Sequence, residues 1–189
     1  ASRLSAVFAL VLLLSPALVV AQQRQSTELG EAFELERRGR YEIAALADLH
    51  DAAMAETDAE LGISPGHYTN ARKMLGKENF DVVAVCTWHI GHTNMTIAVA
   101  ARKPKAILCE KPIATTLADA DRMIEACKRH HTILSVDHTR RFQPVWRYGK
   151  EEIIDKGVIG PVQYVTGTLS GERAMLFRNG KHTIDAICY

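Results

Sequence analysis

The sequence has almost no net charge and few cysteines, and each shortage excludes a class of protein. Lys and Arg number 23 against 22 Asp and Glu, so a net charge of +1 offers no basic field to nucleic acid. The four cysteines form no C-x-x-C pair, which argues against a zinc site and a disulfide framework. We interpret them as reduced core residues, because Cys86 and Cys109 fall in apolar stretches typical of buried strands.

Only one long hydrophobic run is present, and it is short for a membrane span. It extends from Val7 to Val20 and is interrupted by Ser15-Pro16. Ala21 followed by Gln22 is typical of a signal-peptidase site, so residues 1–21 are a candidate export signal. If these residues are not a signal, we expect a cytoplasmic location. Two other interpretations stay open, namely an aberrant N-terminal segment and a first strand formed by residues 17–21. A membrane partner is not expected once such a signal is removed.

Hydrophobic periodicity predicts alternating strands and helices between residues 41 and 137. Mainly apolar runs predict strands at residues 41–48, 81–87, 106–109 and 132–137. Helices are predicted at residues 31–40, 51–61, 71–77, 93–101, 117–129 and 144–156, the last of them ending at Gly157. This alternation predicts an α/β fold with a doubly wound parallel sheet of the Rossmann type. Residues 162–169 alternate in polarity and predict the opening strand of a second, α+β domain.

The helix at residues 117–129 has the clearest pattern. Thr116, with Asp119 three residues later, predicts a side-chain cap at its start. The residues predicted to share its buried face are Leu117, Ala120, Met123, Ile124 and Cys127.

Polar residues follow three of the predicted strands, at the edge where α/β proteins place ligands. Asp48 follows the first of these strands and is suited to the adenosine ribose of a dinucleotide, where it would favour NAD over NADP; the alternative is a helix cap. Thr87, His89 and His92 follow the next strand, and two histidines alone are a weak metal signal. Glu110-Lys111-Pro112 follows the third, and a partly buried lysine near cations can act as acid or base.

A glycine-rich phosphate turn is missing where a dinucleotide would need it. Counting back from Asp48 by one strand–turn–helix unit leads to residues 22–28, which contain no glycine. Side chains with Cβ atoms would crowd the diphosphate, and Glu28 would oppose its charge. Either the phosphate turn is lost or the first strand and turn have been replaced.

In this order, the segments resemble the glucose–fructose oxidoreductase/inositol dehydrogenase (Gfo/Idh/MocA) family of nicotinamide-dependent dehydrogenases. The match covers about residues 30–189 and is densest between residues 81 and 142. Trp88 and His89 stand where the family has Pro and Asn, and Arg178 where many members have Asp. The resemblance implies hydride transfer between NAD or NADP and a sugar-like or cyclitol secondary alcohol. It also leaves a homo-oligomer open.

The resemblance also implies roles for individual residues. Lys111 and His182 would handle the proton of the reacting hydroxyl. A cis peptide bond is common in the family at the position of Lys111-Pro112. The residues placed near the dinucleotide are Asp48, Thr87, His89, His92, Glu110 and Lys111, and those placed near the substrate are Lys111, Arg141, His182 and Asp185.

Three segments follow from these patterns. Residues 1–29 form the signal-like or aberrant segment, residues 30–141 a Rossmann-type domain with a degenerate first strand and glycine turn, and residues 142–189 the start of a substrate domain. The chain thus resembles a truncated family member. The alternative function is a non-catalytic remnant that acts as a binding or interaction protein.

Overall fold

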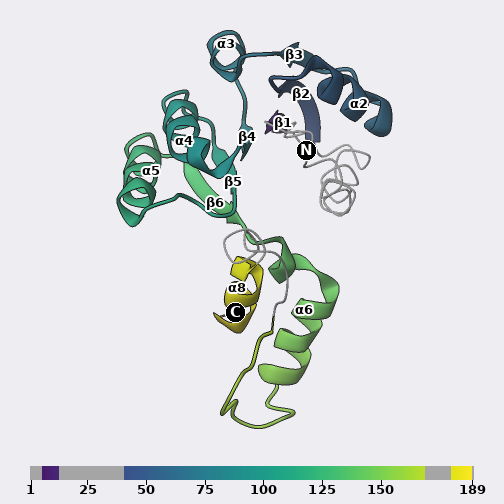
Figure 1. The fold of residues 1–189 in the computed structure, drawn as a ribbon, viewed down its shortest axis with the longest axis vertical. Helices are drawn as coiled ribbons and strands as arrows, with labels where there is room; N and C mark the ends of the chain where they lie inside the picture. The colour runs from purple at the N-terminus through teal and green to yellow at the C-terminus, as the bar shows by residue number, and fades with distance from the viewer. Residues whose placement is uncertain (1–5, 13–40, 169–179, 189) are drawn as a thin grey trace, which may run out of the picture. The chain divides into compact units, whose positions relative to one another are not determined.

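The computed structural model describes residues 6–12, 41–168 and 180–188. The chain divides into two compact units, the first ending at Val136 and the second beginning at Asp137 (Figure 1). The sequence predicts a domain join between residues 141 and 142, and this stays a prediction.

Unit one is built around a six-stranded sheet in the order β3-β2-β1-β4-β5-β6. The strands are β1 (Ala6–Leu12), β2 (Tyr41–Ala47), β3 (Gly66–Tyr68), β4 (Val82–Cys86), β5 (Ala106–Glu110) and β6 (Ile133–Asp137). The pairs β1–β2, β1–β4, β2–β3 and β4–β5 are parallel. This is the strand order of the Rossmann dinucleotide-binding fold, and it confirms the predicted fold class.

The central strand lies earlier in the chain than residues 17–21, which were one of the three alternatives for the apolar run. β1 is Ala6–Leu12 and pairs with both β2 and β4, so residues 17–21 do not fill that place. Ala6–Leu12 is an uninterrupted apolar stretch, whereas Pro16 precedes residues 17–21 and cannot donate to a strand ladder. Residues 13–40, which include the helix predicted at residues 31–40, lie outside the described part of the chain.

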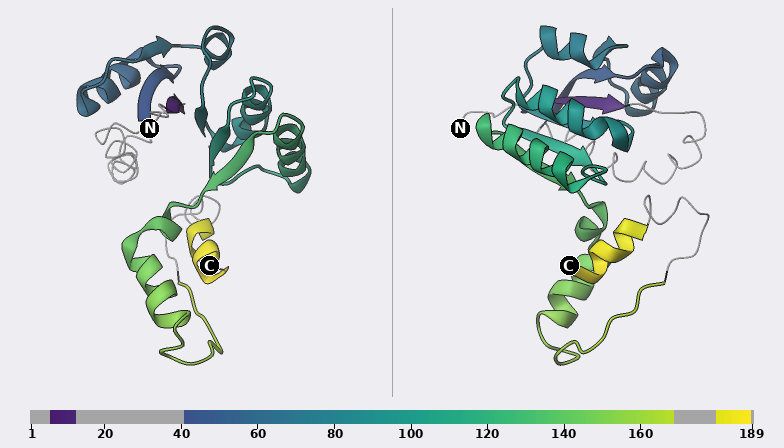
Figure 2. Two further views of the ribbon diagram at one scale, coloured as in Figure 1. Left: turned by 180° about the vertical axis from the view of Figure 1, so that it is seen from behind. Right: turned by 60° about the vertical axis from the view of Figure 1, so that its left-hand side comes forward.

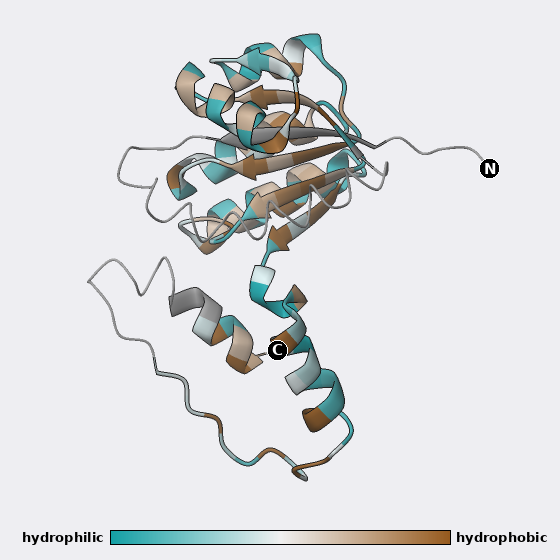
Figure 3. Cartoon of the chain, turned by 90° about the vertical axis from the view of Figure 1, so that its right-hand side faces the viewer, coloured by the Kyte–Doolittle hydropathy of each residue, from teal (hydrophilic) through white to brown (hydrophobic). Residues whose placement is uncertain are grey.

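Helices cover both faces of this sheet (Figure 2). They are α2 (Asp51–Leu61), α3 (Ala71–Lys77), α4 (His92–Ala100) and α5 (Leu117–Arg129). Successive strand residues point to opposite faces, so Leu46 packs with Met54 of α2 while Ala45 joins the cluster that contains Met74 and Met123. Figure 3 shows the hydrophobic residues concentrated along the strands, as expected for a sheet buried on both faces.

The start of α5 is as predicted, but its buried face is narrower. Thr116 Oγ1 accepts a hydrogen bond of 3.1 Å from the Asp119 amide, which confirms the cap. Ala120, Met123 and Cys127 are buried, together with Ala126. The prediction was wrong for Leu117 and Ile124, which are exposed. Leu117 is the first residue of α5, and helical side chains tilt toward the N-terminus of their helix. The Leu117 side chain therefore points beyond the turns of α5 that pack on the sheet.

Unit two begins with a short 3₁₀ turn, η3 (Thr139–Phe142), and contains α6 (Pro144–Tyr148), the π-helical turn η4 (Gly149–Ile154) and α8 (Gly180–Cys188). The predicted helix at residues 144–156 is therefore present, and Gly157 takes a left-handed φ of 68° just beyond it. The strand predicted at residues 162–169 is wrong, because residues 162–168 are irregular. A strand needs a partner, and the described residues of unit two contain no other strand.

The cysteines fall into three environments, and Cys86 is half-buried. Cys109 and Cys127 are buried, and burial raises the pKa of the Cys109 thiol to about 12, so it stays protonated at neutral pH. Cys188 is exposed, which corrects the assignment of all four cysteines to the core. A helix long and apolar enough to span a membrane is not found in the described residues.

Candidate active site

The strands β2 and β4 both pair with β1 in parallel, and β5 pairs with β4 in parallel. The carboxyl ends of β2, β4 and β5 therefore lie along one edge of the sheet. Asp48 follows β2 and is 2% exposed. Its Oδ1 accepts a hydrogen bond of 2.8 Å from the His50 amide, and its own amide donates to the Tyr68 carbonyl at 3.1 Å. The cap of α2 is His50 rather than Asp48, so the helix-cap alternative does not describe this carboxylate. Asp48 instead makes a local turn at the strand end.

The turn after β4 carries three of the predicted cofactor residues. Thr87 is buried, and its hydroxyl lies 3.4 Å from the Trp88 carbonyl. The Trp88 ring is exposed and lies against the His89 ring, with 4.9 Å between the ring centroids. This turn therefore presents two aromatic rings, tilted by 39° to each other, at the ligand edge of the sheet. Contact of Thr87 and His89 with a dinucleotide stays a prediction.

His92 is the most enclosed polar side chain of this edge, with 1% of its surface exposed. Its Nε2 lies 2.7 Å from the Thr87 carbonyl oxygen, and its Nδ1 lies 2.7 Å from the Pro112 carbonyl oxygen. Burial lowers the pKa of His92, although the two carbonyl groups act in the opposite direction. At neutral pH the ring is therefore uncharged and carries a single N–H.

A pH effect on stability follows from this lowered pKa. The unfolded chain takes up a proton at His92 near pH 6.5, whereas the folded chain does so only at lower pH. The stabilising contribution is therefore complete above about pH 6.5 and is lost as the pH falls toward the folded pKa. We expect urea unfolding of the His92→Gln variant to depend less on pH between about 7.5 and 5 than unfolding of the wild type. His130→Gln is the control, and an unchanged slope in His92→Gln would contradict the assignment.

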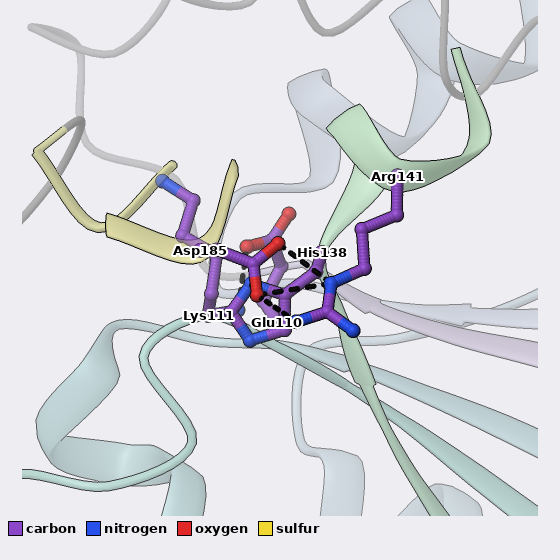
Figure 4. Close-up of polar contacts among 5 residues, drawn as sticks. All are labelled: Glu110, Lys111, His138, Arg141 and Asp185. Carbon is purple, nitrogen blue, oxygen red and sulfur yellow. Dashed lines mark hydrogen bonds and ion pairs between the residues drawn. The ribbon is translucent and has the colours of Figure 1, made fainter. Parts of the chain in front are cut away.

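The turn after β5 holds the Glu110-Lys111-Pro112 sequence in a fixed form. The peptide bond between Lys111 and Pro112 is cis, as the family resemblance implies. Glu110 Oε2 accepts a hydrogen bond of 2.8 Å from the Lys111 amide (Figure 4). Glu110 therefore shapes the backbone that carries Lys111. The lysine side chain is partly exposed at the ligand edge, as an acid or base must be to reach a substrate.

In unit two, Arg141 of η3 and Asp185 of α8 form a two-pronged ion pair (Figure 4). Arg141 Nε lies 2.8 Å from Asp185 Oδ2, and Arg141 Nη2 lies 2.5 Å from Asp185 Oδ1. His138 Nδ1 lies 3.4 Å from the same Oδ1, and no sequence pattern predicted this contact. Its position directly after β6 was the available signal. Arg141 and Asp185 thus bind each other, and their contact with substrate stays a prediction.

His182 lies in the first turn of α8, three residues before Asp185. Its side chain lies outside the described part of the structure, as does Arg178. Residues three apart share a helix face, so the backbone places His182 on the same face as Asp185. Among the described residues, no group of three His, Cys, Asp or Glu side chains could hold a metal ion.

Comparison with known proteins gives one matching family, described as an oxidoreductase family with an NAD-binding Rossmann fold, over residues 21–138. A myo-inositol 2-dehydrogenase of Thermotoga maritima is 34% identical over 118 residues, which cover 62% of this chain and 34% of the relative. A D-xylose 1-dehydrogenase [NADP(+)] of Haloarcula marismortui is 31% identical over 68% of this chain and 35% of the relative.

Solved structures give the same fold. A probable dehydrogenase from Thermotoga maritima has a TM-score of 0.64 and 28% identity, covering 82% of this chain and 42% of the other. An oxidoreductase from Agrobacterium radiobacter, crystallised with NAD⁺, L-tartaric acid and magnesium, has a TM-score of 0.72 and 23% identity, covering 96% of this chain and 53% of the other. The chain spans about a third of the length of the curated relatives named above.

Proposed function

Because this chain belongs to the oxidoreductase family with an NAD-binding Rossmann fold, we propose that it serves an NAD(P)-dependent dehydrogenase reaction. The reaction moves a hydride between the nicotinamide ring and a secondary alcohol of a sugar-like or cyclitol substrate. The observation that carries the proposal is the Rossmann strand order, with Asp48 after β2 and Lys111 after β5 at one edge of the sheet.

One described residue, Asp48, supports binding of the adenosine end of a dinucleotide. Asp48 is an acid at the carboxyl end of β2, where such folds bind the ribose hydroxyls. The Asp48 carboxylate would repel the 2′-phosphate of NADP, so Asp48 favours NAD over NADP. Residues 13–40 contain no G-x-G-x-x-G sequence, so we assign no residue to the diphosphate. When bound, the nicotinamide supplies the hydride chemistry, and the protein supplies position and charge.

Lys111 is the residue we propose to move the proton. A hydride leaves the carbon of a secondary alcohol only as its hydroxyl loses a proton, and a positioned lysine can accept it. Glu110 and Pro112 shape the turn that presents Lys111. His182 is proposed as a second acid or base on the basis of the family resemblance alone.

The proposed substrate class is inferred from two relatives, which are named as an inositol dehydrogenase and a xylose dehydrogenase. Both names refer to polyhydroxylated rings or chains that offer a secondary alcohol or its equivalent. Arg141 and Asp185 are proposed as substrate-side residues. A homo-oligomer and a cytoplasmic location complete the proposal, with export as the alternative if residues 1–21 act as a signal.

A second function is favoured by one specific observation. The stretch between β1 and β2 contains only two glycines, Gly30 and Gly39, and neither is part of a glycine-rich phosphate turn. A chain without that turn can keep the Rossmann sheet and still fail to bind a dinucleotide. In that case the protein acts as a non-catalytic binding or interaction module.

Calorimetric titration of the full chain with NADH and NADPH separates these two functions. We expect saturable NADH binding, weaker NADPH binding, and about a tenfold loss of NADH affinity in Asp48→Asn, as expected for one lost charged hydrogen bond. Asp121→Asn, at an exposed position of α5, is the matched control. A folded, monodisperse sample that binds neither nucleotide would contradict the dehydrogenase and support the binding module.

A further inference from the structure

His92 connects two turns that the proposed reaction needs in register. The chain leaves β4 through Thr87, and it leaves β5 through Glu110 and Lys111 to reach Pro112. His92, the first residue of α4, reaches the Thr87 carbonyl with one ring nitrogen and the Pro112 carbonyl with the other, each at 2.7 Å. We propose that His92 is a positioning residue that fixes the Lys111 turn against the turn after β4.

The geometry of the ring explains why histidine suits this position. Both contacts are made to main-chain carbonyl oxygens, which only accept hydrogen bonds. An imidazole places two nitrogens on opposite sides of a rigid ring, so one side chain can span two backbone segments. In the neutral state its single N–H binds one carbonyl, and the protonated ring would donate to both.

Burial makes the position of this ring well defined. His92 is 1% exposed and opens α4, whose later residues Val99 and Ala100 belong to the buried cluster of the sheet. At this depth water weakens the hydrogen bond of its single N–H very little. The titratable neighbour from its own turn is His89, whose charge would oppose a charge on His92. The partner turn carries Glu110 and Lys111.

The consequence for Lys111 is geometric. Pro112 follows Lys111 directly, so holding the Pro112 carbonyl limits how far the lysine backbone can move. A displacement of about 1 Å at a reacting group can cost about 100-fold in rate. The expected effect of His92 on rate rests on the proposed function of Lys111, whereas the contacts of His92 with the two carbonyl groups do not depend on it.

Three substitutions test the bridge atom by atom. An asparagine amide nitrogen stands near the Nδ1 position and keeps a donor for the Pro112 carbonyl, whereas a glutamine amide nitrogen stands near Nε2 and keeps one for the Thr87 carbonyl. We therefore expect His92→Asn to shift the carbonyl ¹³C resonance of Thr87 and to spare that of Pro112. His92→Gln should give the opposite pattern, and His92→Phe should shift both. His130→Gln, at the end of α5, should shift neither.

The rate measurement then separates positioning from structural support. With a turnover assay, we expect His92→Phe to lower kcat about tenfold or more with KM nearly unchanged, and His92→Asn to recover most of it. If Asn and Gln shift the same carbonyls, or Phe shifts none, the bridge is refuted. If the resonances shift as expected but kcat does not change, the bridge stands without a positioning role and the proposal is overturned. If His92→Phe does not fold, the opposite carbonyl shifts of His92→Asn and His92→Gln decide whether the bridge exists.

If the wild type shows no turnover, the dehydrogenase proposal fails. The positioning role is then tested by hydrogen exchange, and retention of amide-exchange protection at Lys111 in His92→Phe would overturn it.

Discussion

Replacing Lys111 by alanine is expected to lower kcat about 10²- to 10⁴-fold, the usual contribution of a positioned acid or base. The substitution removes the ammonium group but leaves the turn that carries it, because the Glu110 carboxylate binds the backbone amide of residue 111, which alanine keeps. NADH affinity should therefore change by less than about threefold. The measurement is steady-state turnover with inositols and pentoses, together with calorimetric titration of each variant.

Two further variants sharpen this test. Lys111→Arg keeps a positive charge but not a group that releases a proton near neutral pH, so it should be nearly as inactive as alanine. Lys128→Ala removes an exposed lysine near the end of α5, and it should leave kcat unchanged. A Lys111→Arg variant with near wild-type kcat would show that charge alone matters, and a Lys111→Ala variant within about threefold of wild type would remove the residue from the mechanism.

The fold could be predicted from the sequence where each local pattern agreed with its surroundings. The helices at residues 51–61, 71–77 and 117–129 begin and end at the predicted residues. The strands β4 and β5 were recognisable because a buried parallel strand is apolar on both faces. In these segments the local and tertiary preferences coincide.

The prediction failed where the outcome depended on a distant partner. Residues 162–168 alternate in polarity, but alternation describes only one side of a strand pair and cannot supply the other. The position of β1 was left open, because an apolar run alone does not show which of its stretches pairs with β2 and β4. Leu117 fits the helical stripe, yet its place at the first turn leaves it exposed.

The candidate site was predicted in its residues and not in its contacts. Asp48, Thr87 and Lys111 could be found because each follows a buried strand, and parallel strands bring their carboxyl ends to one edge. The interaction of His92 with two carbonyl groups could not be found, since backbone acceptors leave no trace in a sequence. The same holds for the pairing of Arg141 with Asp185, which are far apart in the chain.

Breaking the Arg141–Asp185 pair is expected to cost unit two about 2 kcal/mol, the value of hydrogen bonds to a charged group. Asp185 has a side chain that is 8% exposed, so removing its partner leaves a carboxylate with little access to water. The cost should stay below the 3–5 kcal/mol typical of a fully buried pair because Arg141 is 38% exposed. Arg141→Lys should recover little of the loss, since one ammonium cannot bind both oxygens as the guanidinium does.

A double-mutant cycle of Arg141→Met and Asp185→Leu measures the coupling itself. Urea unfolding is followed by the fluorescence of Trp146, in a Trp88→Phe background so that unit two alone reports. Arg147→Met is the control, because its pair with Glu151 is solvent-exposed and should contribute about 0.5 kcal/mol or less. Single variants that each cost about 2 kcal/mol, with a double variant that costs little more than either, would show that the pair anchors α8 through Asp185. Additive costs would mean that α8, and with it His182, is held by packing instead.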